Sequence, residues 1–124
     1  MEPAVADLAA DSGPLLSVSG VASSPGRFGY LQCEFGAGLL ILRCDDDTDE
    51  IIAEVGNARP DCQPVAEADL TELLGKSIEH AWELRNHRGY EDAFQLRLIA
   101  EDGREETRQF EVAASATDTR RVSP

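Results

Sequence analysis

Apolar and polar residues alternate along several short stretches of the chain, with the period of two that is typical of half-buried β-strands. The alternation is clearest in residues 78–84, where His80 and Trp82 share the predicted apolar face. Other such stretches begin at residue 16 and cover residues 31–35, 39–42, 51–55, 94–98 and 107–113. Residues 39–42 are apolar at every position, so we expect both faces of that strand to be covered.

The connections between these stretches are short, and several contain glycine. Residues 36–38 and 102–103 carry hairpin-turn sequences, and hairpin loops join antiparallel neighbours. Leucines recur at helical spacing in residues 70–74 before Gly75, which predicts one short helix. The sequence therefore predicts an α+β fold: a single domain with a meandering antiparallel sheet of six or seven strands and one or two short helices.

The chain length of 124 residues fits one domain. We expect residues 1–13 to form a flexible N-terminal arm, residues 14–114 the globular domain and residues 115–124 a polar C-terminal tail. No apolar run approaches the ~20 residues that span a bilayer, and the start of the chain lacks the basic region of a signal peptide. The sequence therefore predicts a cytoplasmic protein without membrane contact.

The three cysteines, Cys33, Cys44 and Cys62, cannot form a closed disulfide framework and do not have metal-ligand spacing. A hairpin that turns at residues 36–38 would place Cys33 near Ile41 rather than near Cys44. We therefore expect reduced thiols, in agreement with a cytoplasmic compartment.

Charge is the strongest compositional feature of the chain. Asp and Glu number 24 against 11 Lys and Arg, for a formal net charge of −13. This balance argues against direct nucleic-acid binding, which depends on Lys and Arg displacing counterions from phosphates. Residues 44–83 alone carry a net charge of −10, which is either a solubility device or a surface for a basic protein partner. The predicted partner-binding residues are Asp45, Asp46, Asp47, Asp49, Glu50, Asp69 and Glu72.

No residue pattern in the chain completes a catalytic or metal site. The acidic run of residues 45–50 begins like a calcium loop, but Glu50 and Gly56 stand where an EF-hand needs Gly and Glu, so we expect a solvated turn. His80 is expected to be a hydrogen-bonded core or rim residue. His87 has acids nearby but no nucleophile or second ligand. The sequence thus favours a protein with no catalytic residues, metal, cofactor or enzyme activity.

One stretch carries a more specific signature, a Trp-x-Leu-x-Asn-x-x-Gly-Tyr-x-Asp-Ala-x-Gln-Leu run over residues 82–96. In this run, in the preceding Gly75-Lys76 pair and in residues 49–52 upstream (Asp-Glu-Ile-Ile), the chain resembles a family of small uncharacterised bacterial proteins. Similar small acidic proteins often occur as immunity partners of bacterial toxins, so the resemblance implies a toxin-binding role. The residues expected to support the hairpin and its loop are Trp82, Asn86, Gly89, Tyr90 and Asp92.

Three functions are compatible with these features. The first is an immunity or antitoxin-like protein that binds a cognate toxin and neutralises it by steric and electrostatic blocking. It needs only a rigid sheet, an acidic face and a few buried anchors. The second is a small enzyme or ligand-binding protein that uses the loop around His87, Tyr90 and Asp92, and the third is a regulatory adaptor. The expected oligomeric state is a monomer or a homodimer.

Overall fold

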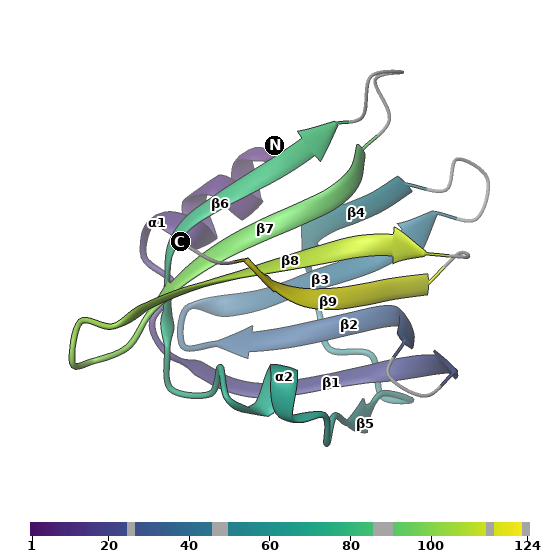
Figure 1. Ribbon diagram of the computed structural model, residues 1–124, viewed down its shortest axis with the longest axis horizontal. Coiled ribbons are helices and arrows are strands. Elements are labelled where there is room, and N and C mark those ends of the chain that lie inside the picture. Colours follow the sequence, from purple (N-terminus) through teal and green to yellow (C-terminus); the bar gives the residue numbers. More distant parts are fainter. Residues whose placement is uncertain (25–26, 46–49, 86–90, 114–115, 123–124) are drawn as a thin grey trace.

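The computed structural model describes residues 1–24, 27–45, 50–85, 91–113 and 116–122, which form two helices and nine strands (Figure 1). The helices are α1 (Pro3–Ala10) and α2 (Ala68–Thr71). The strands are β1 (Leu15–Ser24), β2 (Arg27–Phe35), β3 (Gly38–Asp45), β4 (Glu50–Val55), β5 (Gln63–Pro64), β6 (Ser77–Arg85), β7 (Glu91–Ile99), β8 (Glu105–Ala113) and β9 (Ala116–Val122). Within these residues, no helix has the length and apolar character needed to cross a membrane.

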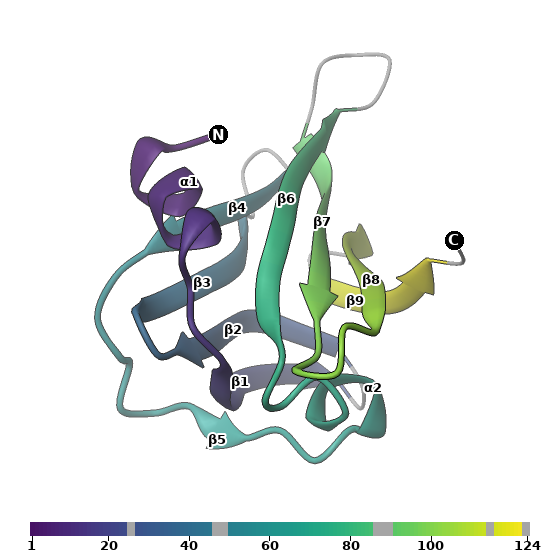
Figure 2. The same ribbon diagram turned by 90° about the vertical axis from the view of Figure 1, so that its left-hand side faces the viewer.

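The strands form two antiparallel meanders, β1 to β4 and β6 to β9. Their order along the sheet is β4-β3-β2-β9-β8-β7-β6, with β1 on β2 and the short β5 on β1. In the described part of the chain, the two meanders are joined through a single pair, Phe28 with Thr117. Figure 2 shows them folded toward each other as two layers. The prediction of an α+β single domain with a meandering antiparallel sheet is confirmed.

The hydrophobic core lies between the two layers and takes residues from both. Side chains that are at most 1% exposed include Leu31, Leu40, Leu42, Phe94, Leu98 and Phe110. Because successive residues of a strand point to opposite faces, each strand supplies alternate residues to this core. Ile41 points to the outer side of β3 but is also buried, since the chain at Gly56 passes close to it. Both faces of residues 39–42 are therefore covered, as predicted.

Helix α1 closes the gap between β4 and β6, the first and last strands in the order along the sheet. It packs against both of these strands and against β3 (Figure 2). Val5 and Leu8 lie one helical turn apart, face the core and are 2% and 7% exposed. Pro3 stands in the first helical turn, where its fixed φ angle favours the helix. The segment expected as a flexible arm at residues 1–13 is therefore part of the domain.

The residues that follow α1 tie the helix to both layers. Ser12 is 1% exposed, and its Oγ accepts a 2.9 Å hydrogen bond from the Ile78 backbone N–H. The Ser12 carbonyl oxygen accepts a second bond, of 2.8 Å, from the Ala37 N–H. Gly13 has a φ angle of +67° and passes close to Gly36, so a side chain at residue 13 would be strained. Ser12 thus connects two segments by hydrogen bonds, the turn between β2 and β3 and the start of β6.

Strands β5 and β9 account for the difference between the predicted six or seven strands and the nine observed. Strand β9 pairs with β8 from Val122, opposite Thr107, to Ala116, opposite Ala113. Its sequence is polar, so hydropathy predicts a tail over residues 115–124. Backbone hydrogen bonds to β8 do not depend on hydropathy, and they make a strand of most of this segment.

The turn between β2 and β3 is one residue shorter than predicted. Phe35 pairs with Gly38, which leaves residues 36–37 as the turn and places Cys33 opposite Leu40. Cys44 lies opposite Ile51, on the other neighbour of β3. Cys33 is buried, whereas Cys44 and Cys62 are half-buried.

We expect Cys33 to resist alkylation in the folded protein. It is 4% exposed, and burial raises the pKa of its thiol to about 12, so the reactive thiolate is absent at neutral pH. Cys44 and Cys62 are only half-buried and should react first. Mass spectrometry after iodoacetamide treatment should therefore show Cys33 modified only in denaturant. Prompt modification of Cys33 in the native protein would contradict its place in the core.

Candidate functional site

The acidic run begins where β3 ends and finishes where β4 begins. Asp45 is the last residue of β3 and Glu50 the first of β4, and the two are paired across the ladder. Both residues are half-buried. Asp46, Asp47 and Asp49 lie outside the described residues. The two ends of the run therefore meet at one end of the strands, away from both helices (Figure 1).

Asp69 and Glu72, the other two predicted partner-binding residues, lie elsewhere. They belong to α2 and to the turn that follows it, and Figure 1 shows α2 apart from the junction of β3 and β4. Asp69 is exposed, whereas the Glu72 carboxylate forms an ion pair with Arg108 of the same chain. The expectation that these acids join the acidic run in one surface is therefore not met, and the Glu72 carboxylate, although 39% exposed, is already paired within the chain.

Arg108 is the centre of an ion-pair network between β8 and α2, and its side chain is only 1% exposed. The guanidinium forms an ion pair with Glu72 through Nη2, and Nη1 lies 2.8 Å from Glu106 Oε1. Its Nε donates a 3.1 Å hydrogen bond to the carbonyl oxygen of Asp69. Lys76 Nζ lies 2.5 Å from the second oxygen of Glu106. Two cations thus meet two carboxylates, which offsets the cost of burying Arg108.

The alternation of β8 explains why these charges face inward. Glu106 and Arg108 lie on the same side of the strand as Phe110, which is a core residue. Helix α2 is short, and Gly75, with a φ angle of +85°, completes the turn toward β6. Sequence reasoning missed this network because charged residues at alternate positions usually mark the exposed face of a strand. The signal that could have found it is the shared parity of Arg108 and Phe110.

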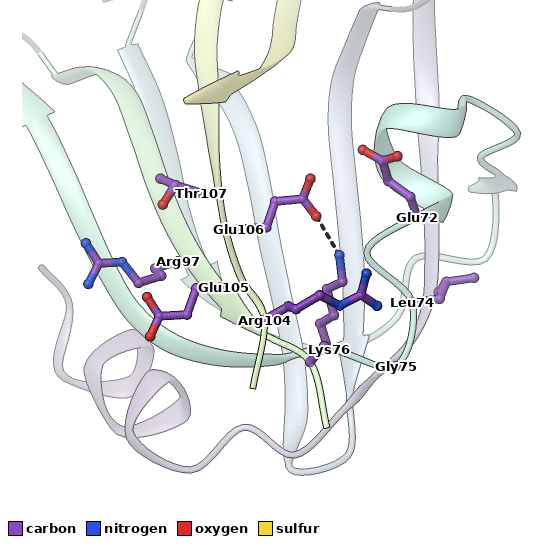
Figure 3. A pocket seen from close by; sticks show the side chains of 10 residues that line it. Glu72, Leu74, Gly75, Lys76, Arg97, Arg104, Glu105, Glu106 and Thr107 are labelled. Carbon is purple, nitrogen blue, oxygen red and sulfur yellow. Dashed lines mark hydrogen bonds and ion pairs between the residues drawn. The ribbon is translucent and has the colours of Figure 1, made fainter. Parts of the chain in front are cut away.

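A hollow of about 810 Å³ opens beside this network (Figure 3). Its charged lining residues are Glu72, Lys76, Arg97, Arg104, Glu105 and Glu106. Figure 3 shows the pair of Lys76 and Glu106 near the middle, with the Arg97 and Glu105 side chains near each other to one side. The lining therefore offers both signs of charge. Among the described residues that line it, none is a histidine or a cysteine.

Trp82 and His80 lie on the outer face of β6, opposite to the prediction. The ladder of β6 and β7 shifts register between Ile78 and His80, and such a β-bulge changes which residues face the core. Ile78 is buried and Ala81 packs on the core, whereas His80 is exposed and Trp82 half-buried. The expectations that Trp82 shares a core face with Ile78, and that His80 lies on that face, are therefore wrong.

His80, Trp82 and Arg97 form a cluster on this outer face. The ring centroids of His80 and Trp82 lie 4.3 Å apart, with the ring planes tilted by 50°. The guanidinium carbon of Arg97 lies 5.2 Å from the Trp82 ring centroid, within the range of a cation–π interaction. Arg97 Nη1 is also 3.9 Å from a Glu79 carboxylate oxygen. These contacts hold the indole ring at the surface.

The loop of the 82–96 signature falls outside the described residues. This applies to Asn86, Gly89 and Tyr90, and to His87 with them. Asp92 belongs to β7, where only its backbone is described. The described part of the signature is the antiparallel pair of β6 and β7, in which Trp82 stands opposite Gln95.

Comparison with known proteins gives a family and no closer relative. The whole chain, residues 1–124, matches a family of unknown function (DUF6334). No curated protein and no solved structure matches the chain. Among the described residues, no group of three or more His, Cys, Asp or Glu side chains could hold a metal ion.

Proposed function

The chain belongs to the DUF6334 family, whose function is unknown, and from its charge and fold we propose that it binds a basic protein and neutralises it by covering its surface. In this role it is an immunity or antitoxin-like protein of a bacterium. It acts as a rigid binder without chemistry of its own. The resemblance of residues 82–96 to small bacterial proteins supports this role by association.

The proposal depends mainly on one observation, that carboxylates of the same chain bind most of the described cations. The described cations with a carboxylate oxygen within 4 Å include the N-terminal amino group of Met1 and the side chains of Arg43, Arg59, Lys76, Arg97, Arg104 and Arg108. Because the chain has 24 acidic but only 11 basic side chains, the charge that is not compensated within the chain is negative. A basic partner therefore meets an attractive potential, whereas an acidic one is repelled.

The negative charge supports a simple mode of inhibition. It attracts a basic partner over a distance on the order of 8–10 Å at physiological ionic strength. A toxin with an anionic substrate, such as a nuclease, carries a positive surface for that substrate. Acids that occupy this surface make inhibition competitive. The acidic residues belong to a two-layer sheet closed by α1. Because this fold is rigid, little conformational entropy is lost when the chain binds.

Capture from a lysate of the native cell tests the proposed function. The immobilised chain is the bait, binding is carried out at low ionic strength, and retained proteins are eluted with a salt gradient and identified by mass spectrometry. We expect a basic protein whose activity is inhibited by the added chain. Retention of no protein, or of a protein that stays fully active in the complex, would contradict the proposal.

Removing the acidic run should slow association with the captured partner. The variant carries Asp45→Asn, Asp47→Asn, Asp49→Asn and Glu50→Gln. We expect the association rate at low ionic strength to fall about tenfold or more, because long-range attraction speeds the encounter. The fold should survive, since Asp45 and Glu50 stand at strand ends outside the hydrophobic core. Surface plasmon resonance measures the rate.

A matched control removes the same number of charges elsewhere. It carries Glu2→Gln, Asp7→Asn, Asp11→Asn and Glu34→Gln, all at exposed residues. Figure 1 shows α1 at the opposite end of the strands from the junction of β3 and β4. The control should slow association less than the acidic-run variant does. If the acidic-run variant binds at the wild-type rate, the acidic run serves solubility and does not steer the partner.

The hollow beside Arg108 favours a second candidate function, the binding of a small ligand. Its lining pairs cations with carboxylates, which suits a ligand that carries both charges. The alternative site that the sequence indicates, around His87, lies outside the described residues. A thermal-shift screen of amino acids and other zwitterions separates the two functions. Stabilisation that disappears in Arg104→Ala would favour ligand binding, and its absence would favour protein binding.

A further inference from the structure

We propose that the outer face of β6, β7 and β8 around Trp82 is a contact surface for a second copy of this chain. The proposal is independent of any toxin partner, since it concerns the purified chain alone. The contact uses the face of the sheet and not its edge. Helix α1 packs beside β6, and Pro14 forms a β-bridge with Ser77, so the edge of β6 is already covered.

Electrostatics favours this face over others. The side chains near Trp82 on this face are His80, Gln95, Arg97, Glu105 and Thr107, with Glu79 at the bulge lying 3.9 Å from Arg97. Gln95 and Thr107 carry no charge, and Arg97 lies between two carboxylates, Glu79 and Glu105, so the face has both signs of charge. A chain with a net charge of −13 repels its own copy over much of its surface. Because this face has both signs of charge, two copies meet there with less repulsion than at a purely acidic surface.

Trp82 gives the face a large apolar anchor that the core does not use. It is the only tryptophan of the chain, and the bulge between Ile78 and His80 places it on the outer side. Trp and Arg are among the residue types most enriched at interface hot spots. The contacts with His80 at 4.3 Å and Arg97 at 5.2 Å already order the ring, so little entropy is lost when a partner covers it.

A row of polar side chains beside Trp82 is also ordered in advance. Trp82 stands opposite Gln95, and Gln95 stands opposite Gln109, so the row crosses three strands. Gln95 Nε2 donates a 2.5 Å hydrogen bond to Gln109 Oε1, and Gln109 is 7% exposed. Gln109 is already buried, so its hydrogen bond orders the Gln95 amide, whose remaining donor and acceptor groups can bond to polar groups of a partner. The face can therefore pack against a flat partner surface.

The charges of the face are complementary to themselves, which a two-fold contact requires because both copies present the same residues. Arg97 lies 3.9 Å from Glu79, and Figure 3 shows it near Glu105. Arg97 of one copy can therefore exchange its own carboxylate neighbour for one on the other copy. The same exchange brings the two Trp82 rings into one interface.

Sedimentation equilibrium of the purified chain at physiological salt tests the proposal. From micromolar to millimolar concentration, the mean mass should rise from 13.4 kDa toward twice that value. In Trp82→Ser, and separately in Arg97→Glu, the dissociation constant of the dimer should rise about tenfold or more. Both residues lie outside the core, so the variants should fold, and Arg97→Glu tests the same face if Trp82→Ser does not fold.

The matched control is Leu16→Ser, on β1 in the other meander. Leu16 is 55% exposed, so this variant removes an apolar surface residue away from the proposed face and should dimerise like the wild type. Adding Glu105→Arg to Arg97→Glu should restore association, because it reverses both signs together. A wild-type chain that stays monomeric at millimolar concentration would overturn the proposal. So would variants at Trp82 and Arg97 that dimerise as tightly as the wild type.

Discussion

Replacing Leu8 by Asp is expected to leave the chain largely unfolded. Leu8 is 7% exposed and, together with Val5, fills the gap that α1 closes between β4 and β6. Truncating a buried leucine costs about 2–5 kcal/mol, and an unpaired carboxylate in the same place adds several more. A small domain has a total stability of about 5–15 kcal/mol, so this single change is of the same order. Urea unfolding followed by circular dichroism measures the effect.

The control for Leu8→Asp is Asp7→Asn on the outer side of the same helix. Asp7 is exposed, so the free energy of unfolding of the Asp7→Asn variant should stay within about 0.5 kcal/mol of the wild-type value. Leu8→Asp should also aggregate, because α1 no longer covers the edges of β4 and β6. A Leu8→Asp variant as stable as Asp7→Asn would show that α1 is a loose arm, as composition alone predicts.

Replacing Arg108 by Ala is expected to cost about 3–5 kcal/mol of stability, the usual range for breaking a buried ion pair. Arg108 binds Glu72, Glu106 and the Asp69 carbonyl, so its loss releases α2 from β8. Glu106 keeps its contact with Lys76, which places the cost at the lower end of the range. The change in the urea midpoint gives the value.

Two further arginine variants test whether the stability depends on the buried position of Arg108 and on the geometry of its guanidinium group. Arg104→Ala is the surface control, since the Arg104 side chain is 80% exposed and its pair with Asp102 should contribute little. Arg108→Lys keeps the charge but loses the planar fork, so it should fall between Arg108→Ala and the wild type. Equal stability of Arg108→Ala and Arg104→Ala would mean that the network does not hold α2.

Local sequence rules predicted the hairpins and hence the fold class. The Asp102-Gly103 pair is a turn in which Gly103 has a φ angle of +88° and donates its N–H to the Ala100 carbonyl at 2.9 Å. Leu70 and Leu73 are buried, as their spacing indicates, but α2 ends at Thr71 and Leu74 is 45% exposed. These features depend on residues that are close in sequence, so they can be predicted from the local amino-acid pattern.

The prediction of which side chains face the core was wrong at two β-bulges. One lies between Leu15 and Ser17, and it leaves Leu16 exposed although its parity matches that of buried Val18. The other lies between Ile78 and His80 and places Trp82 on the outer face. A bulge adds one residue to one strand, so every later side chain changes face. The pattern of the sequence does not mark where this happens.

Contacts between distant segments were also beyond a reading of local pattern. The packing of Val5 across β4 and β6 depends on where those edges end up in space. The pairing of Arg108 with Glu72 joins residues 36 positions apart. For the candidate site, sequence placed the acidic run correctly at a strand junction. It counted Glu72 as a partner-binding acid, although the Glu72 carboxylate is paired with Arg108 of the same chain, because charge alone does not show which carboxylate a buried arginine will bind.

The dependence of the association rate on ionic strength tests most directly whether negative charge guides this chain onto a basic protein. The measurement uses the partner captured from the lysate, with both rate constants followed from low to physiological salt. We expect the association rate to fall about tenfold or more over this range, while the dissociation rate, set by short-range packing, changes much less. An association rate that does not change with salt would contradict electrostatic guidance.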